Sequence, residues 1–479
     1  MNDQLVWGPF SLDRQVGTTH FLVSGTTGSG KSTLVELLLR SVFRGRESLN
    51  DRALIYDAKQ EIIPKLEALY LGDRVRVLHP YDSRCSPWDL AKDLDDPLSA
   101  RQFANILIPE STNRNAEGGF FEDACRDIIA VAIQTLSQCA GKPDWTFRDL
   151  ILSLLYPKNS SALFQMTTRR DGRPFPAAHR IWEAYLDPKS TDERTRGNIR
   201  ATLNSRLSPF ETVAAAWTHA TSEPISFKQW NRGNQILVLG NDEAARSTVD
   251  PINRAMFQRA TELVLARPEG QSSLSWFFMD ELREAGRLDA LNSLLLKGRS
   301  KGAAVVISFQ DIEGLRDVYG DHKANEIVAN CSNTALLRTN SSDTAEWASQ
   351  MFGKFIVVEK DSTAGVSGTE LTRSSTTRLS ERQAVQPGDL LYLPLASRKE
   401  GLIGLFKDAF SQQNEARLHR LDGDLIDESR IHGRGESFSP IPTQNLILEP
   451  WSDDERLSLG FGILESETPL DMKPPTRQK

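Results

Sequence analysis

A run of glycine, hydroxyl and lysine residues near the beginning of the chain has the spacing of a phosphate-binding loop. Residues 25–32 read Gly-Thr-Thr-Gly-Ser-Gly-Lys-Ser, which fits the pattern G-x-x-x-x-G-K-S without a gap. Glycines permit a tight loop whose backbone N–H groups face inward, and the next helix adds the positive end of its dipole. The lysine of such a loop reaches the β and γ phosphates, and the serine can bind Mg²⁺. The residues expected to contact ATP are Gly25, Thr26, Thr27, Gly28, Ser29, Gly30, Lys31, Ser32 and Thr33.

Two acidic residues end an apolar segment that is typical of a buried strand. Residues 275–281 read Ser-Trp-Phe-Phe-Met-Asp-Glu, so both acids are expected at the carboxyl edge of a parallel sheet, where ligands bind. We expect Asp280 to hold magnesium together with Ser32, and Glu281 to polarise the attacking water. The alternative is that one or both acids cap the next helix. Asp57, after another apolar segment, is a rival magnesium ligand, but the Asp-Glu pair favours Asp280 and suits hydrolysis.

Two further polar residues are candidates for catalysis. Gln310 ends the apolar segment 303–309, so it is expected at the same edge, where it could sense the γ phosphate or orient water. The alternative is a polar residue at the start of a helix. Arg299 lies in the glycine-flanked segment Lys-Gly-Arg-Ser-Lys-Gly at 297–302 and could reach the phosphates of a neighbouring subunit. Its alternative is an ordinary solvated basic loop.

Short apolar segments alternate with helical patterns in two separate parts of the chain. Strands are predicted at residues 20–24, 53–56, 75–78, 235–239, 274–279, 303–309 and 335–338. This alternation predicts an α/β fold whose mainly parallel sheet has helices on both faces. The glycine-rich loop follows the first of these strands and opens a leucine-rich helix, so the fold class is a P-loop NTPase. Residues 354–405 have shorter alternating segments, which are more typical of hairpins.

Between these two parts lies a stretch of helical patterns without strand-like segments. One of its helices is expected to begin at a capping box formed by Thr146 and Asp149. We therefore divide the chain into a first part of the nucleotide-binding domain, an all-α inserted domain, a second part of the nucleotide-binding domain and a flexible C-terminal tail. The predicted boundaries are 1–94, 95–223, 224–435 and 436–479.

The composition excludes several classes of protein. With 479 residues, of which 39% are hydrophobic and 25% charged, the chain can form a packed core. A net charge of −7 excludes DNA binding by bulk positive charge, although a local basic channel is compatible with it. The four cysteines form no C-x-x-C pair and predict neither a disulfide framework nor a zinc site. No apolar run approaches the ~20 residues of a membrane span, so we expect a cytoplasmic location.

Several segments together resemble the TraD/TraG-type coupling ATPases of conjugation and type IV secretion. The segments that carry the resemblance are 88–90, 104–110, 120–127, 278–292, 297–302, 305–312, 334–339 and 344–348. Their order and spacing cover roughly residues 15–410. The family motifs correspond to the phosphate-binding loop with Lys31 and Ser32, the acidic strand end at Asp280 and Glu281, a third-motif glutamine at Gln310 and an arginine finger at Arg299.

The resemblance implies a RecA-like hexamer that uses ATP and Mg²⁺ to pump single-stranded DNA, or a relaxase–DNA complex, through a central channel. The implied partners are DNA, a relaxase or other relaxosome proteins, and the type IV secretion channel or a separate membrane anchor. Family members usually begin with two membrane-spanning helices, whereas here Gly25 lies close to the first residue. A naturally membrane-free relative, peripheral attachment to the inner membrane through a partner, and a soluble HerA/FtsK-like translocase in DNA processing or defence are therefore the alternatives.

Direct support for DNA binding in the sequence is a basic stretch within one predicted helix. Its basic residues are Arg194, Arg196, Arg200 and Arg206. These side chains could follow DNA phosphates, but an exposed basic helix face is an equal alternative. A second function class is a platform on which ATP binding switches assembly and the helical insertion docks protein cargo. The catalytic set of Glu281 plus Arg299 favours the motor, because a switch does not need fast hydrolysis.

Overall fold

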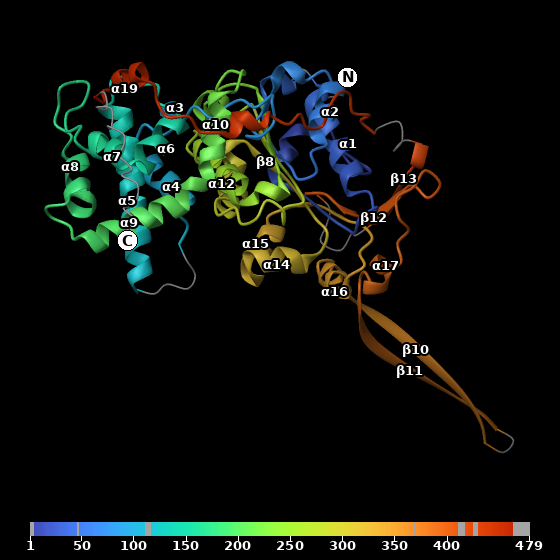
Figure 1. Ribbon diagram of the computed structural model, residues 1–479. Helices are drawn as coiled ribbons and strands as arrows, with labels where there is room; N and C mark the ends of the chain where they lie inside the picture. Colours follow the sequence, from blue (N-terminus) through green and yellow to red (C-terminus); the bar gives the residue numbers. More distant parts are fainter. Residues whose placement is uncertain are drawn as a thin grey trace, which may run out of the picture. The chain divides into compact units, whose positions relative to one another are not determined.

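The computed structural model describes residues 4–45, 47–110, 116–367, 370–410, 417–424 and 430–462. The chain divides into two compact units (Figure 1). Unit 1 consists of Met1–Cys85 and Phe227–Ser439, and unit 2 consists of Ser86–Ser226 and Pro440–Lys479. Unit 2 therefore contains the segment 95–223 that we expected to be an insertion, together with short flanking segments and the C-terminal residues.

The centre of unit 1 is a nine-stranded sheet. Its strands are β3 (Phe21–Ser24), β4 (Arg52–Asp57), β5 (Val75–Val77), β6 (Ile236–Gly240), β7 (Ser275–Asp280), β8 (Ala303–Phe309), β9 (Asn333–Leu336), β12 (Leu402–Lys407) and β13 (Arg417–Leu421). Their order is β13-β12-β9-β3-β8-β7-β4-β6-β5. All neighbours from β9 to β5 are parallel, and β12 pairs with β9 and β13 in the antiparallel direction. The predicted α/β fold with a mainly parallel sheet is confirmed, and the carboxyl ends of β3, β8, β7 and β4 share one edge.

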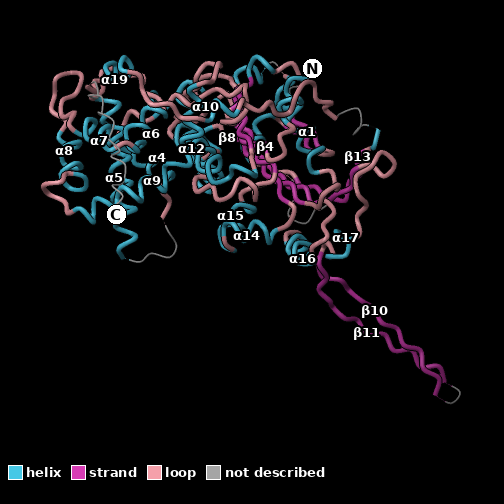
Figure 2. The backbone as a smooth tube through the Cα atoms, in the orientation of Figure 1, coloured by secondary structure: helices cyan, strands magenta, loops and turns pink. Residues whose placement is uncertain are grey.

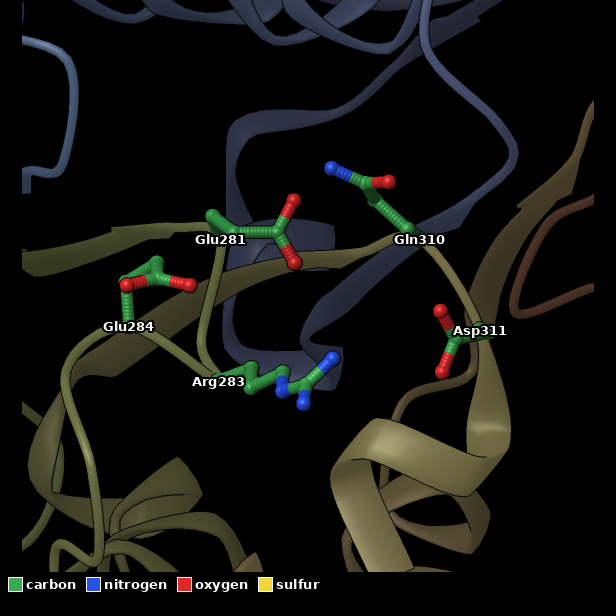
Figure 3. Close-up of a pocket in the computed structure, with 5 residues that line it drawn as sticks. All are labelled: Glu281, Arg283, Glu284, Gln310 and Asp311. Carbon is green, nitrogen blue, oxygen red and sulfur yellow. The ribbon is translucent and has the colours of Figure 1, made fainter.

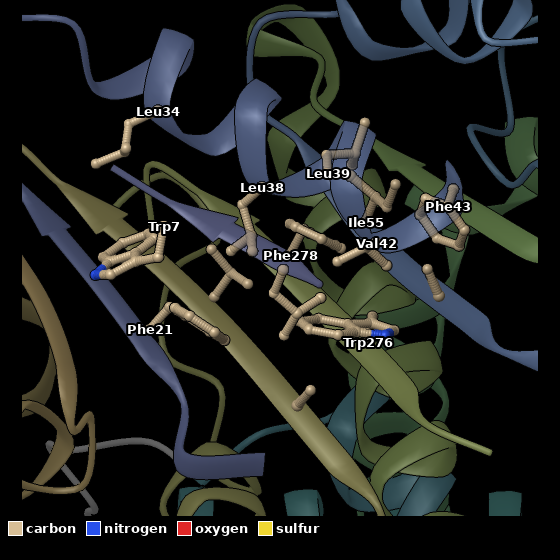
Figure 4. Close-up of a cluster of buried hydrophobic side chains, with 14 of the residues drawn as sticks. Trp7, Phe21, Leu34, Leu38, Leu39, Val42, Phe43, Ile55, Trp276 and Phe278 are labelled. Atoms are coloured by element: carbon tan, nitrogen blue, oxygen red, sulfur yellow. The ribbon is translucent and has the colours of Figure 1, made fainter. Parts of the chain in front are cut away.

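Helices cover both faces of this sheet. The helices of unit 1 are α1 (Lys31–Arg44), α2 (Ile62–Ala68), α11 (Phe227–Trp230), α12 (Arg246–Leu265), α13 (Leu291–Lys297), α14 (Ile312–Tyr319), α15 (Asp321–Ala329), α16 (Ser342–Gln350) and α17 (Pro387–Leu391). Trp276 and Phe278 of β7 lie in the buried cluster that includes Leu38 and Val42 of α1 (Figure 4). Between them, Phe277 lies edge-on to Phe257 of α12, with ring centroids 5.9 Å apart. Because successive strand residues alternate between faces, a strand buried on both sides must be apolar throughout.

Two antiparallel hairpins lie outside the main sheet. The first joins β1 (Leu5–Trp7) to β2 (Phe10–Leu12), and the second joins β10 (Lys354–Ser367) to β11 (Glu370–Gln383). Figure 2 shows β10 and β11 as a long two-stranded ribbon, and among the described residues these strands pair only with each other. The prediction of hairpins in this region is confirmed, but the two strands are longer than the short segments that we expected.

Within the described residues, the regular elements of unit 2 are helices. They are α3 (Leu90–Asp93), α4 (Pro97–Leu107), α5 (Ala116–Gln138), α6 (Phe147–Leu155), α7 (Pro157–Phe164), α8 (Pro176–Ile181), α9 (Glu193–Leu207), α10 (Glu211–Thr218) and α19 (Asp453–Leu459), with short 3₁₀ and π turns between them. The predicted capping box opens α6: the Thr146 amide donates to Asp149 Oδ2 at 2.8 Å, and the Asp149 amide donates to Thr146 Oγ1 at 3.3 Å. None of the helices in the described part of the chain is apolar over a length sufficient to cross a bilayer.

The predicted flexible tail, 436–479, differs from the structure over residues 440–462. This segment packs within unit 2, where the indole of Trp451 is only 8% exposed and donates to Asp149 Oδ1 at 2.8 Å. The segment has little periodicity, which led to the prediction of a tail. A few aromatic side chains and one capped helical turn nevertheless give it a defined place. Residues 463–479 lie outside the described residues.

Replacing Trp451 by alanine is expected to lower the free energy of unfolding of unit 2 by about 3 kcal/mol, because truncating a buried aromatic side chain leaves a cavity. The lost contacts would include the stacking on Phe461, whose ring centroid lies 5.0 Å away, and the hydrogen bond to Asp149. Thermal unfolding followed by circular dichroism measures the effect. Trp451→Phe keeps most of the ring and is the matched control. A Trp451→Ala protein as stable as the wild type would contradict the packing described for residues 440–462.

Candidate nucleotide-binding site

The glycine-rich loop leaves the carboxyl end of β3 and leads directly into α1. Gly28 and Gly30 have φ angles of 78° and 102°, in the left-handed region that favours glycine. A side chain on Gly25 would bring its Cβ within 2.6 Å of Ser29 Oγ and 2.8 Å of Leu337 Cβ, so only glycine fits there. The amide of Thr26 donates to the carbonyl of Arg338 at 2.7 Å, which ties the loop to the segment that follows β9.

The interior of the loop carries the features of an anion site. The Lys31 side chain is buried, and burial lowers the pKa of its ammonium group, although nearby carboxylates oppose the effect. Its Nζ donates to the carbonyl of Gly25 at 2.5 Å, so the lysine lies over the loop. Ser29 Oγ is buried without a hydrogen-bond partner among the described residues. Thr33 is buried behind the loop, whereas Thr27 is exposed at its tip. These groups fit the phosphates of a nucleotide.

One serine positions both acidic residues at the end of β7. Ser308 of the neighbouring strand β8 donates its hydroxyl proton to Asp280 Oδ1 at 2.9 Å and accepts the amide N–H of Glu281 at 3.1 Å. Glu281 has a φ of 58°, a left-handed conformation that costs energy for a residue with a side chain. Such strained residues often occur at functional sites because the surrounding structure holds them in place. The strand end thus turns sharply, and Asp280 and Glu281 are held in separate directions.

Glu281 lies beside the loop lysine in a buried environment. Burial raises the pKa of the Glu281 carboxyl above its usual range, and the nearby charge of Asp280 acts in the same direction. The positive charge of Lys31 and a hydrogen bond from Gln310 act against this shift. A carboxylate with a raised pKa is a better proton acceptor than an exposed one, which suits a residue that activates water.

Gln310 shares a small pocket with Glu281. The pocket has a volume of about 80 Å³ and is lined by Glu281, Arg283, Glu284, Gln310 and Asp311. Figure 3 shows the amide of Gln310 close to the carboxylate of Glu281 and the guanidinium of Arg283 between Glu281 and Asp311. The end of β8 therefore brings Gln310 to the acidic residues, at the edge where we expected it.

Asp57, the rival magnesium ligand, binds backbone N–H groups at the beginning of a helix. It ends β4 in register with Asp280, but its two carboxylate oxygens accept the amide N–H groups of Glu61 at 3.1 Å and Ile62 at 2.8 Å. It thus caps the beginning of α2. Burial raises the pKa of Asp57, and the two N–H donors partly offset the shift. Asp280 remains the better candidate for a metal ligand, because its carboxylate lies near the hydroxyl of Ser32. The Nζ atom of Lys59 contacts both groups, at 3.8 Å from Asp280 Oδ2 and 3.1 Å from Ser32 Oγ.

Asp280→Asn is expected to raise the Mg²⁺ concentration required for nucleotide binding by about 10–100-fold, the usual effect of removing a group around a bound metal. Asp57→Asn should instead lower the free energy of unfolding by about 1 kcal/mol, because the charged cap of α2 is weakened. Fluorescent ADP titrated at several Mg²⁺ concentrations, with thermal unfolding of both variants, separates the two effects. A larger change in the Mg²⁺ requirement for Asp57→Asn than for Asp280→Asn would reverse our assignment.

Arg299 lies away from the other candidate residues. It begins a 3₁₀ turn, Arg299–Lys301, directly before β8, whereas Gln310 follows the other end of the same strand. The seven residues of β8 separate the two ends by roughly 20 Å. Near this opposite edge, burial lowers the pKa of His20 to about 4, and the charge of Arg299 adds to that effect. Arg299 therefore cannot reach the phosphate-binding loop of its own chain.

The basic stretch expected to contact DNA forms part of α9 in unit 2. Two of its arginines are engaged within the unit: Arg206 pairs with Glu122 at 2.7 Å, and Arg196 Nε donates to the carbonyl of Thr191 at 3.1 Å. Ile199, Leu203 and Leu207 of the same helix are buried. The structure thus gives a packing role to one face of α9 and a local pairing role to two of its basic residues.

The sequence analysis did not consider the pocket residues Arg283, Glu284 and Asp311, nor two residues that contact Asp280. Ser308 is a polar residue in an otherwise apolar strand, which is a recognisable sign of a buried hydrogen bond. Lys59 follows Asp57 by two residues, and its Nζ lies 3.1 Å from Ser32 Oγ and 3.8 Å from Asp280 Oδ2. Neither contact could be inferred without the strand order that makes β7 the neighbour of both β4 and β8.

The chain is similar to proteins of conjugation over most of its length. The sequence model of the family described as type IV secretion-system coupling protein DNA-binding domain matches residues 4–411. Coupling protein TraD of Escherichia coli (strain K12) is 26% identical over 353 residues, which are 72% of this chain and 45% of TraD. The chain thus spans less than half the length of this curated relative.

Solved structures of the plasmid coupling protein TrwB have the same fold. The complex with the non-hydrolysable GTP analogue GDPNP has a TM-score of 0.63 and 20% identity, and 92% of each chain is covered. The complex with ADP and Mg²⁺ has a TM-score of 0.61 and 21% identity, and covers 92% of this chain and 93% of TrwB. The mainly parallel sheet of unit 1 with its flanking helices is therefore part of a fold that this chain shares with TrwB.

Proposed function

Because the chain belongs to the type IV secretion-system coupling protein family, we propose that it is an ATP-hydrolysing motor that moves DNA during conjugation or secretion. The observation that carries this proposal is the meeting of Lys31, Asp280 and Glu281 at one edge of the sheet, with Gln310 hydrogen-bonded to Glu281. A binding loop alone would serve a switch, whereas a buried carboxylate beside it, with a raised pKa, supports hydrolysis.

Each residue has a distinct role in the proposed reaction. The backbone N–H groups of the loop and the Lys31 ammonium bind the nucleotide phosphates. Ser32 and Asp280 would hold Mg²⁺, which neutralises charge on the phosphates when it is bound. Glu281 accepts a proton from the attacking water. The Gln310 amide, hydrogen-bonded to Glu281, orients that water. Ser308 fixes the end of β7 by bonding both the Asp280 carboxylate and the backbone amide of Glu281.

We infer that the working form is a ring of identical chains, in keeping with the hexamer that the family resemblance implies. The position of Arg299 supports this inference, since it lies at the edge opposite to the loop of its own chain. In such a ring, Arg299 would contact the nucleotide bound to a neighbouring subunit. Hydrolysis would then depend on assembly, because each site is completed by the next chain.

The proposed substrate is DNA, in single-stranded form or as a relaxase–DNA complex. The DNA-binding description of the matched family model supports DNA as the substrate, and unit 2 offers a helical surface for relaxase or other relaxosome proteins. The relevant channel partner is the type IV secretion machinery, reached directly or through a separate membrane anchor. A ring with a basic lining in its channel is compatible with the net charge of −7.

Displacement of streptavidin from a biotinylated single-stranded oligonucleotide tests the motor directly. The protein is expected to release streptavidin only when ATP and Mg²⁺ are present, and Lys31→Ala should abolish release. If ATP changes the binding of a relaxase or of a second copy of the chain but never displaces streptavidin, the protein is an ATP-switched docking platform instead of a translocase.

A further inference from the structure

Lys59 places a positive charge beside the two side chains proposed to hold magnesium. Its Nζ donates to Ser32 Oγ at 3.1 Å and lies 3.8 Å from Asp280 Oδ2. We propose that Lys59 is a competing cation at the magnesium subsite, whose ammonium group must leave Ser32 and Asp280 when a Mg²⁺–nucleotide complex binds. This inference rests on the proposed nucleotide-binding function and adds a control on its metal requirement.

The oxygens that Lys59 contacts have the chemistry that Mg²⁺ prefers. A hydroxyl and a carboxylate are hard oxygen ligands, and Mg²⁺ binds such atoms at about 2.0–2.1 Å or through water. An ammonium group bound between Ser32 and Asp280 uses the same lone pairs. The positive charge of this ammonium group also repels a divalent ion bound to the same two side chains. Both cations therefore cannot occupy this position at once.

The surroundings fix the backbone of Lys59 while leaving its side chain able to move. Asp57 accepts two N–H groups from the beginning of α2, and Gln60 donates its side-chain amide to the carbonyl of Asn241 at 2.7 Å. The Lys59 side chain is 44% exposed, and among the described residues Asp280 is its acidic partner within ion-pair distance. Four flexible methylene groups allow the ammonium to leave the subsite without any change in the β4–α2 connection.

The two lysines of the site contact different oxygen atoms of the protein. Lys31 Nζ donates a hydrogen bond to the carbonyl of Gly25 inside the loop, whereas Lys59 Nζ donates to Ser32 Oγ and forms an ion pair with Asp280. Without metal, Lys59 is thus positioned to attract a phosphate itself. When Mg²⁺ is present, Lys59 competes with it for the oxygens of Ser32 and Asp280. Loss of its charge should therefore weaken nucleotide binding in the absence of Mg²⁺ and lower the Mg²⁺ concentration needed for tight binding.

The test is the binding of a fluorescent ADP derivative to the full chain, measured with EDTA and across a range of Mg²⁺ concentrations. In Lys59→Met the Mg²⁺ concentration at half-maximal binding is expected to fall about fivefold, the effect of one partly exposed ion pair. Binding in EDTA is expected to weaken by a similar factor. Lys59→Gln provides a second neutral variant, and Lys59→Arg keeps the charge and should keep the wild-type midpoint. Lys323→Met, which removes an exposed lysine on α15, is the matched control and should change nothing.

Three results would overturn the inference, and they have different meanings. An unchanged Mg²⁺ midpoint in both folded neutral variants means that Lys59 does not compete with the metal. A raised midpoint means that Lys59 assists the metal instead. If the wild type binds no nucleotide at any Mg²⁺ concentration, the proposed function fails, and the inference fails with it. The wild-type titration alone separates this last case from the other two.

Discussion

Glu281→Gln is expected to bind ATP as tightly as the wild type and to hydrolyse it about 10²–10⁴ times more slowly, the usual contribution of a general base. Glutamine has nearly the same shape and can still bond Gln310, but it cannot accept a proton from water. The metal ligand Asp280 and the loop lysine remain in place, so binding should be retained. Release of phosphate measures hydrolysis, and fluorescent ATP measures binding.

The nearby Glu284→Gln variant is the matched control for this prediction. Glu284 lines the same pocket but pairs with Arg246 at 2.8 Å, so its loss should have little effect on turnover. The pH dependence gives a second readout. Because the pKa of Glu281 is raised by burial, the wild-type rate should begin to fall on acidification at a pH above the usual glutamate range. Wild-type turnover by Glu281→Gln would remove Glu281 from the mechanism.

Arg299→Ala should bind ATP normally and lose about 10³–10⁵ in its hydrolysis rate, the range found for arginines supplied from a neighbouring subunit. The expected loss rests on the proposed ring, in which Arg299, at the far end of β8 from its own phosphate-binding loop, contacts the phosphates of a neighbouring subunit. Lys301→Ala is the control, because Lys301 lies in the same turn and pairs with Glu269 at 3.5 Å.

Mixing two inactive variants separates a role in an interface from a role within one chain. Lys31→Ala lacks the phosphate-binding charge but keeps Arg299, and Arg299→Ala has the reverse defect. Mixed rings contain interfaces that join an intact loop to an intact arginine, so part of the activity should return. Specific activity of the wild type should also rise steeply with protein concentration. If assembled mixtures gain nothing and Arg299→Ala alone stays active, Arg299 is an ordinary surface residue.

The fold could be predicted from short-range patterns. The central parallel strands β7 and β8 are buried on both faces, so they appear in the sequence as nearly continuous apolar segments, as in 275–280. The phosphate-binding loop is equally local, since its glycines, Lys31 and Ser32 are adjacent in the sequence. The capping box at the start of α6 is a third example, because all of its hydrogen bonds join residues within one turn.

The contacts that complete the site depend on strand order and could not be predicted. Ser308 is 28 residues from Asp280 in the sequence but binds it because β8 is the neighbour of β7. Lys59 meets Ser32 and Asp280 only because β4 lies on the other side of β7. The C-terminal residues were predicted to be flexible for the same reason: the partner of Trp451 is Asp149, in a distant part of the sequence.

The rate of ATP hydrolysis with and without single-stranded DNA tests the central claim most directly. If the chain is a DNA-driven motor, added DNA should increase the rate severalfold or more at a fixed protein concentration. The stimulation should be absent in Lys31→Ala and Glu281→Gln, and it should persist in the Lys301→Ala control. A wild-type protein that binds ATP and DNA but hydrolyses ATP at the same negligible rate in both conditions would contradict the account.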